Sequence, residues 1–277
     1  QIYDAAGAIV GDEFQVNTHT VNMQFDQHII GLNNGDFVIT WTSQNQDGSA
    51  NGIYAKRYDS AGVIVDDEFL VNTYTAGNQQ EPSITALNDG GFVITWTSYN
   101  QTPGTGFDIY AQQFDAAGAK ATTNAVRFGS LNAEVGQWNP SITGLNNGDF
   151  IITWNSYGQG LDSELGVHAE RYAVDGSYVG SEFQVNTYTN QNQFHPSITS
   201  LNDGGFIITW NSYNQHTTGS DYDIYAQRYD ALGAVVGNEF LVNTYTDGLQ
   251  IAINSSITSL NDGGFVITWT SYGQDGH

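Results

Sequence analysis

A five-residue phrase, Phe, then Val or Ile, then Ile-Thr-Trp, recurs along the chain and constrains its fold more than any other feature. Its tryptophans are Trp41, Trp96, Trp154, Trp210 and Trp269, so successive copies lie 55, 58, 56 and 59 residues apart. Self-similarity at a steady period is typical of repeat architectures, in which each unit buries its faces by stacking on its neighbours. The chain is therefore predicted to consist of copies of one unit.

Each unit contains four short segments that favour β-strands, because they are rich in β-branched and aromatic residues and bounded by Gly, Asn and Asp. In one unit they begin at Pro196 (Pro-Ser-Ile-Thr), Gly205 (the Trp phrase), Ile224 (Ile-Tyr-Ala-Gln-Arg-Tyr-Asp) and Glu239 (Glu-Phe-Leu-Val-Asn-Thr). Asn-Asp-Gly between the first two segments supplies the positive φ angles of a tight hairpin turn. No stretch shows a helical period.

Four-stranded units repeated in this way are typical of propeller blades. We predict an all-β fold, a five-bladed β-propeller of four-stranded antiparallel blades. Residues 1–18 supply only the last two strands of a unit and residues 245–277 only the first two, so a hybrid blade from both termini is expected to close the ring. The single domain 1–277 then divides into blades 19–73, 74–129, 130–187, 188–244, and 245–277 with 1–18.

The alternative to a closed five-bladed ring is that the chain is a segment of a larger propeller or of an open array of repeats. The sequence starts at Gln1 inside a repeat and without Met, which leads us to expect a piece of a longer chain.

Copies of the sequence from Leu201 to Asp230 occur over essentially the whole chain. This sequence contains Leu-Asn-Asp-Gly-Gly-Phe-Ile-Ile-Thr-Trp followed by Ile-Tyr-Ala-Gln-Arg-Tyr-Asp. It resembles the repeats of very large secreted bacterial proteins that also carry RTX-type calcium-binding nonapeptides and adhesin-like modules. The resemblance implies secretion or a place at the cell surface. The nonapeptide Gly-Gly-x-Gly-x-Asp and the Asp-x-Asp-x-Asp-Gly loop are absent, so calcium is implied by the resemblance alone and no cofactor is predicted.

Composition narrows the range of partners. The chain has 29 acidic and 6 basic residues, a net charge of -23, and no cysteine. Nucleic acid and membranes are not expected as partners, because phosphates and anionic surfaces are bound by clustered Lys and Arg and no apolar run approaches a membrane span. The lack of Cys excludes thiol catalysis and disulfides. The six His residues show no metal-ligand spacing, so no metal site is predicted.

Glycosidases with five blades place carboxylates around the central channel, on or near the innermost strands. The innermost strand here reads Pro-Ser-Ile-Thr or a variant of it, and acids precede it in two units only, at Asp26 and Glu81. Like residues that recur around a ring do not supply the unlike groups that converge in an active site. The sequence therefore predicts that the chain is not an enzyme.

Candidate ligand contacts lie in two sets of loops expected on one face of the propeller. The first set joins the second and third strands of a unit, where the units differ in length, and the second set joins the fourth strand of one unit to the first strand of the next. Each set carries a recurrent Gln near aromatic residues, and aromatic faces with amide groups suit sugar rings. The alternative is that these Gln side chains only tie loop backbones together. The candidates are Tyr99, Gln101, Tyr157, Gln159, Tyr213, Gln215, Tyr272, Gln274, Gln46, Gln79, Gln137 and Gln193.

A recurrent spacing of charges predicts an ion pair inside each blade. Arg57, Arg171 and Arg228 each precede a Glu by 11 residues, and the unit that has Gln113 in place of Arg has Asn124 in place of Glu. Joint loss of the two charges indicates that they interact between the third and fourth strands, through the guanidinium fork.

These observations favour a secreted, non-enzymatic binding or adhesion module, with a carbohydrate or a cell-surface or extracellular protein as its partner. A structural or self-assembling module of a large extracellular surface protein is the alternative, since near-identical blades and strong negative charge suit it. A glycosidase would need a carboxylate cluster that the recurring phrases do not contain.

Overall fold

The protein is described by a computed structural model that covers residues 1–102, 104, 106–129, 136–159, 164–216, 222–251 and 257–274. Every secondary-structure element within these ranges is a β-strand. The same ranges contain no helix long and apolar enough to cross a membrane. The all-β prediction is confirmed.

Four sheets in the described part of the chain have four antiparallel strands each, hydrogen-bonded in chain order. Blade 1 comprises β3 (Gln24–Gly31), β4 (Phe37–Gln44), β5 (Asn51–Tyr58) and β6 (Ile64–Leu70). Blade 2 comprises β7 (Gln79–Ala86), β8 (Phe92–Tyr99), β9 (Phe107–Phe114) and β10 (Val126–Phe128). Blade 3 comprises β11 (Gln137–Gly144), β12 (Phe150–Tyr157), β13 (Leu165–Tyr172) and β14 (Phe183–Gln184). Blade 4 comprises β15 (Gln193–Ser200), β16 (Phe206–Tyr213), β17 (Tyr222–Tyr229) and β18 (Val235–Leu241).

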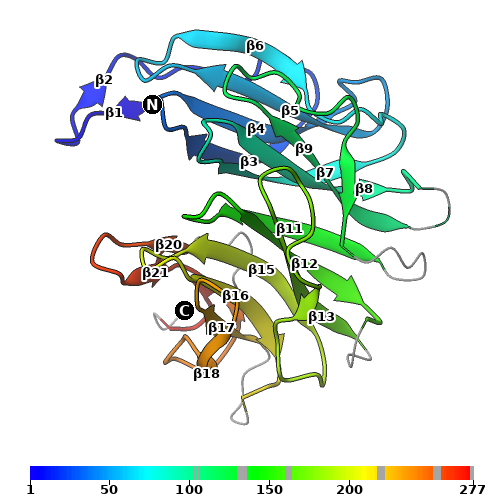
Figure 1. Cartoon of the computed structure of the whole chain (residues 1–277), viewed down its shortest axis with the longest axis vertical. Coiled ribbons are helices and arrows are strands. Elements are labelled where there is room, and N and C mark those ends of the chain that lie inside the picture. The colour runs from blue at the N-terminus through cyan, green and yellow to red at the C-terminus, as the bar shows by residue number, and fades with distance from the viewer. Residues whose placement is uncertain are drawn as a thin grey trace.

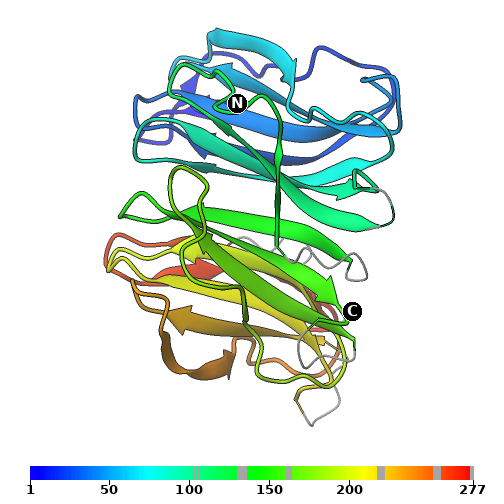
Figure 2. The ribbon, with the colours of Figure 1, turned by 45° about the vertical axis from the view of Figure 1, so that its right-hand side comes forward.

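Consecutive blades stack face to face, and the first strand of each blade lies against the first strand of the next (Figures 1 and 2). Strands β3, β7, β11 and β15 are therefore the innermost strands of the stack. The prediction of four-stranded antiparallel blades is confirmed for these units.

The fifth unit is present in two groups of strands. At the C-terminal end, β19 (Gln250–Ile251) pairs with β22 (Thr270–Ser271), and β20 (Ile257–Ser259) pairs with β21 (Phe265–Ile267), with β20 beside β15 of blade 4. At the N-terminal end, β1 (Ile2–Tyr3) pairs with β2 (Ile9–Val10) and lies with blade 1 in Figure 1. Among the described residues no strand pair joins the two groups.

The N-terminal segment makes the contacts with blade 1 that a fourth strand makes with the blade after it. The ring of Phe14 lies 5.3 Å from that of Tyr58. Corresponding pairs join later blades at 5.5 Å (Phe69 and Phe114) and 5.4 Å (Phe183 and Tyr229). The two ends of the chain thus flank blades 1 and 4 in the positions expected of a fifth blade.

The hydrophobic core lies in the seams between blades. Between blades 2 and 3, Leu87 and Val93 pack in one cluster with Ile142, Ile152 and Trp154. Both faces of the second strand are covered in this way, so that strand is apolar or Thr at nearly every position. The recurring Trp is consequently buried in blades 1 to 4: Trp41, Trp96, Trp154 and Trp210 are at most 3% exposed.

The hydroxyls of Pro-Ser-Ile-Thr connect neighbouring innermost strands. Ser83 Oγ accepts a hydrogen bond of 3.3 Å from the backbone N of Ile142, and Thr85 Oγ1 accepts one of 2.8 Å from Gly144. Ser141 and Thr143 repeat these contacts with blade 4. The phrase recurs because the backbone amides of an innermost strand that face the preceding blade need an acceptor.

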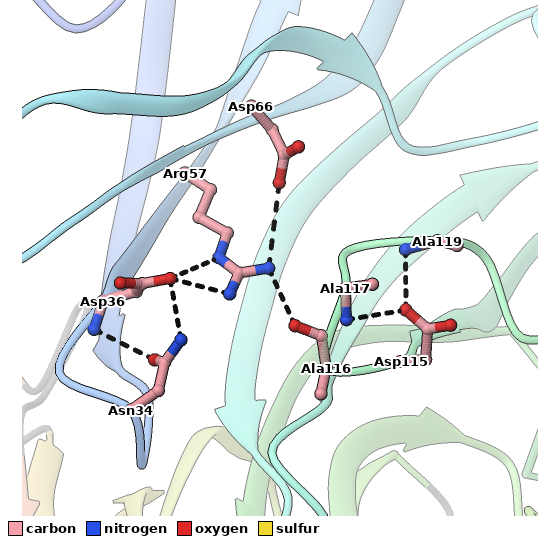
Figure 3. A network of polar contacts seen from close by, with 8 residues as sticks. All are labelled: Asn34, Asp36, Arg57, Asp66, Asp115, Ala116, Ala117 and Ala119. Carbon is pink, nitrogen blue, oxygen red and sulfur yellow. Dashed lines mark hydrogen bonds and ion pairs between the residues drawn. The ribbon is translucent and has the colours of Figure 1, made fainter.

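Arg57 joins blade 1 to blade 2 (Figure 3). Its Nη2 and Nε lie 2.7 and 2.9 Å from Oδ2 of Asp36 in the turn between β3 and β4, and its Nη1 donates to the carbonyl of Ala116, 3.0 Å away. Arg171 makes the same contacts with Asp149 and Ala231, and Arg228 pairs with Asp203.

The predicted ion pair between each Arg and the Glu eleven residues later is therefore wrong. In the register of β5 and β6, Asp66 and not Glu68 lies opposite Arg57, and Glu68 accepts hydrogen bonds from Thr18 and Gln46 instead. The guanidinium binds the first hairpin turn of its own blade and the second hairpin turn of the next.

Candidate functional site

Each innermost strand of blades 1 to 4 contains a β-bulge, where its register with the second strand shifts. One residue in each bulge has a positive φ angle: Asp26 (53°), Glu81 (58°), Asn139 (52°) and His195 (52°). A non-glycine residue in this region of backbone space costs about 1–3 kcal/mol, and such strained residues cluster at functional sites. We call these four residues the axial cluster.

The axial cluster occupies one repeat position but has four different polar side chains, unlike the recurring phrases around it. Glu81 Oε2 accepts hydrogen bonds from Thr97 Oγ1 (2.8 Å) and from the backbone N of Asn139 (3.0 Å). Asn155 Nδ2 donates to Asn139 Oδ1 over 2.9 Å. Residues of the second strands and of adjacent blades therefore fix the orientation of Glu81 and Asn139.

The two carboxyl groups of the axial cluster differ in the causes that shift their pKa values. Burial raises the pKa of Glu81, the hydrogen bonds from Thr97 and Asn139 oppose that rise, and the charge of Asp26 adds to it. Burial also raises the pKa of Asp26, but from a lower ordinary value of 3.8 and against the effect of His28. We therefore expect Asp26 to ionise before Glu81.

The histidine of the cluster is held in its neutral form, because burial lowers the pKa of His195. Its Nδ1 lies 3.4 Å from Nδ2 of Asn211. A carboxyl group with a raised pKa can transfer a proton, and an amide and an imidazole at the same position of neighbouring innermost strands can hydrogen-bond hydroxyl groups. Among the residues that the structure describes, no group of three or more His, Asp or Glu is placed to hold a metal ion.

Most Gln candidates of the first loop set are bonded inside their own blade. Oε1 of each accepts from a Ser hydroxyl on the second strand: Ser43 to Gln46, Ser98 to Gln101, Ser156 to Gln159 and Ser212 to Gln215. The amide nitrogens of Gln46, Gln159 and Gln215 donate to Glu68, Glu182 and Glu239. Gln274 is exposed. The bonded amides stabilise the blades.

The Gln candidates of the second set are buried. Gln79, Gln137 and Gln193 are 0% exposed. Oε1 of Gln193 accepts from Nδ2 of Asn186 over 3.1 Å. Burial places these three side chains out of reach of a ligand on the surface.

The Tyr candidates are the accessible members of the predicted site. Tyr99, Tyr157 and Tyr272 are 40%, 54% and 56% exposed. Tyr213 is half-buried, with its ring 4.9 Å from that of Tyr222 in the same blade. The predicted residues therefore mostly contact other residues of their own blade. In the axial cluster, which the prediction did not include, Glu81 and Asn139 instead contact each other across two blades.

No family model matches the sequence, and no curated protein is similar to it in sequence. Solved structures are similar in fold. An endo-arabinase from Bacteroides thetaiotaomicron has a TM-score of 0.54 and 14% identity, over 93% of this chain and 92% of that one. An α-L-arabinofuranosidase from Fusarium graminearum, in complex with an iminosugar inhibitor, has a TM-score of 0.57 and 12% identity, over 87% and 73%. A xylan β-1,4-xylosidase from Bacillus halodurans has a TM-score of 0.50 and 14% identity, over 88% and 48%.

These similarities define the class of fold: the prediction of an all-β propeller of four-stranded antiparallel blades is confirmed, and the neighbours are five-bladed β-propellers, which fits the predicted number of blades. They contradict the prediction of a non-enzymatic adhesion module of RTX-like character, because the proteins that share the fold are glycoside hydrolases. The prediction failed because it rested on the recurring phrases, whereas the acids lie at the one bulge position where the blades differ. At 12–14% identity the similarity establishes the fold alone.

Proposed function

We propose that the chain is a glycoside hydrolase whose active site is the axial cluster. The observation that carries this proposal is Glu81, a carboxyl group held at positive φ on an innermost strand, with a pKa raised by burial and by the charge of Asp26. Glycoside hydrolysis generally requires such a pair, one acid that keeps its proton and one ionised carboxylate.

Glu81 is the general acid in this proposal. It protonates the glycosidic oxygen as the bond to the anomeric carbon breaks, so the leaving sugar departs as an alcohol rather than as an alkoxide. Asp26 is the second carboxylate, which either activates a water molecule or attacks the anomeric carbon. The bonds from Thr97 and Asn139 hold the Glu81 carboxyl in one orientation.

Asn139 and His195 are proposed to orient the substrate, since a neutral imidazole and an amide donate to and accept from sugar hydroxyls. The cluster has an amide and an imidazole in blades 3 and 4, so only blades 1 and 2 contribute carboxylates to it.

Pentose-containing glycans are the proposed substrates, since the fold neighbours are named for arabinan, arabinofuranosides and xylan. Such polymers are too large to enter a cell, which supports the expectation of a secreted protein. The chain's charge of -23 fits an uncharged substrate better than an acidic polymer.

The test is to incubate the purified chain with arabinan, arabinoxylan, xylan and the 4-nitrophenyl pentosides, and to measure released sugar. We expect hydrolysis of at least one substrate, and a loss of about 100-fold or more on the polysaccharide, the general range for a missing acid–base group, in Glu81→Gln and in Asp26→Asn. Glu13→Gln and Asp67→Asn are matched controls at exposed positions and should retain full activity. A folded chain inactive on the whole panel, or a Glu81→Gln variant with full activity on the polysaccharide, would contradict the proposal.

A further inference from the structure

A glutamate on the fourth strand is held by the same kinds of donor in blades 1 and 4. Glu239 of blade 4 accepts hydrogen bonds from the backbone N and the hydroxyl of Thr187, over 2.7 and 2.9 Å, and from Nε2 of Gln215. Glu68 of blade 1 accepts hydrogen bonds from the Thr and the Gln at the same two repeat positions. The two carboxylates therefore lie in equivalent surroundings.

Blade 1 places a buried cation beside its carboxylate. Lys56 on the third strand is 3% exposed, and its Nζ lies 3.3 Å from the carbonyl oxygen of Val16 and 5.7 Å from the centre of the Tyr58 ring. Burial acts to raise the pKa of Glu68, but its hydrogen bonds and the charge of Lys56 outweigh this effect and lower that pKa. The ammonium group thus stabilises the ionised carboxylate of its own blade.

Blade 4 lacks this cation. Gln227 stands where blade 1 has Lys56, and its Nε2 donates to the backbone carbonyl of the next residue over 3.0 Å. In the described part of the chain, no ion pair includes Glu239. The six Lys and Arg side chains contact other groups: Lys56 the carbonyl of Val16, Lys120 that of Val71, Arg57 Asp36, Arg127 Asp108, Arg171 Asp149 and Arg228 Asp203.

A cavity of about 370 Å³ lies beside Glu239. Gln227 and Glu239, the counterparts of Lys56 and Glu68, both line it, so it occupies the side of the blade where blade 1 holds its lysine. Two further lining residues on β18 leave room for an apolar group. Val235 provides an aliphatic surface, and at Gly237, with a φ of 74°, an added Cβ would meet no atom within 4 Å.

We propose that this cavity binds an alkylammonium ion, a primary ammonium group on an aliphatic stem, as in a free amine or a lysine side chain. The ammonium group replaces the one that Lys56 supplies in blade 1 and neutralises Glu239, while the stem lies against Val235. An ammonium group has three N–H donors, which suit a carboxylate and the amide oxygen of Gln227. The net charge of -23 also concentrates cations near the chain.

The donor set does not suit a divalent metal ion. Calcium takes six to eight oxygen ligands, several of them from carboxylates, whereas Glu239 is the one acidic side chain among the described residues that line the cavity. The axial cluster does not contribute to these lining residues. The site is therefore separate from the proposed active site, and its test does not depend on hydrolysis.

Titration calorimetry at low ionic strength tests the ligand class. n-Butylammonium chloride is compared with n-butanol, which has the same stem without the charge. We expect saturable 1:1 binding of the ammonium ion, at least about 10-fold tighter than any binding of the alcohol. Nα-acetyl-lysine methylamide carries the same group on a side chain, so its binding would extend the site to lysine residues, and binding of n-butylammonium alone would assign it to free amines. No saturable binding of either amine, or equal binding of the alcohol, would overturn the proposal.

Two variants locate the site. Gln227→Lys gives blade 4 the lysine that blade 1 has, so this variant should fold and lose n-butylammonium binding by at least about 10-fold, because its own ammonium group occupies the cavity. Glu239→Gln should weaken binding by a similar factor through loss of the counter-charge. Glu13→Gln is the matched control, since Glu13 has the same repeat position and is exposed, and it should bind as the unaltered chain does. Undiminished binding in folded Gln227→Lys or in Glu239→Gln would overturn the assignment.

Discussion

The backbone N of Asn139, in blade 3, donates a hydrogen bond of 3.0 Å to Oε2 of Glu81, in blade 2. The position of the carboxyl group therefore depends on two blades and not on one. Thr97 Oγ1 contacts the same oxygen from 2.8 Å. Side chains held in this way keep their geometry before a substrate arrives, which is the condition for efficient acid–base catalysis.

Removal of the Thr97 hydroxyl should shift the pH dependence of activity. Its hydrogen bond favours the ionised form of Glu81 and lowers the pKa of that carboxyl, so Thr97→Val raises the pKa. A general acid is active only when protonated, so the alkaline limb of the rate profile should move to higher pH. Thr95→Val is the control, because the Thr95 hydroxyl donates to the carbonyl of Tyr110 instead. A limb that moves to lower pH would argue against Glu81 as the acid.

Glu81 should make the fold less stable at neutral pH. A carboxyl whose pKa is raised in the folded state contributes stability that is fully present below its ordinary pKa of 4.5 and is lost as the pH rises through the folded value. Glu81→Gln imitates the protonated form, so its thermal midpoint should equal that of the unaltered chain at about pH 4 and exceed it at about pH 8. Glu13→Gln should show no such divergence. A Glu81→Gln variant that loses stability relative to the unaltered chain as the pH rises would refute the expectation.

The arginine contacts should differ in strength according to burial. The side chains of Arg57 and Asp36 are 5% and 14% exposed, and those of Arg228 and Asp203 are 40% and 54% exposed. Arg57→Met should cost about 2 kcal/mol, because it leaves a shielded carboxylate without its partner. Arg228→Met should cost under about 1 kcal/mol, since water screens that pair. Urea unfolding of both variants compares them, and equal costs would contradict the reasoning.

Gln159 should matter for stability and not for sugar binding. It bridges Ser156 and Glu182, so Gln159→Ala should lower the free energy of unfolding by about 1–2 kcal/mol and leave KM unchanged. Gln274→Ala, at an exposed position, should change neither quantity. A raised KM with unaltered stability in Gln159→Ala would restore this amide as a ligand contact.

The blades could be predicted from the sequence because their determinants are local and repeated. The phrase from Ile109 and the Asn88-Asp89-Gly90 turn correspond to β9 and to the turn between β7 and β8, where Gly90 has a φ of 91°. The Arg contacts could not be predicted, because the partners of Arg57 lie in two turns, at Asp36 of its own blade and at Ala116 of the next, which only the folded and stacked blades bring together.

The axial cluster could not be predicted from the repeats for a related reason. Comparison of repeats emphasises what they share, and Glu81, Asn139 and His195 differ at one shared position, directly before Pro in each case. A polar residue that varies at a fixed place before Pro is the signal that could have identified them. That the backbone there adopts positive φ and brings Glu81 to Asn139 is a property of the stacked blades, which no single repeat contains.

The most direct test of Glu81 as the acid compares two leaving groups. A general acid matters most when the departing sugar is a poor leaving group, and little for 4-nitrophenolate, which departs without protonation. For Glu81→Gln, we predict that the specificity constant, kcat/KM, falls by about 100-fold or more on the arabino- or xylo-oligosaccharide that the chain hydrolyses, and by less than about 10-fold on the matching 4-nitrophenyl pentoside. Equal losses on the two substrates, or no loss on the oligosaccharide, would show that Glu81 is not the acid and that the axial cluster is not the active site.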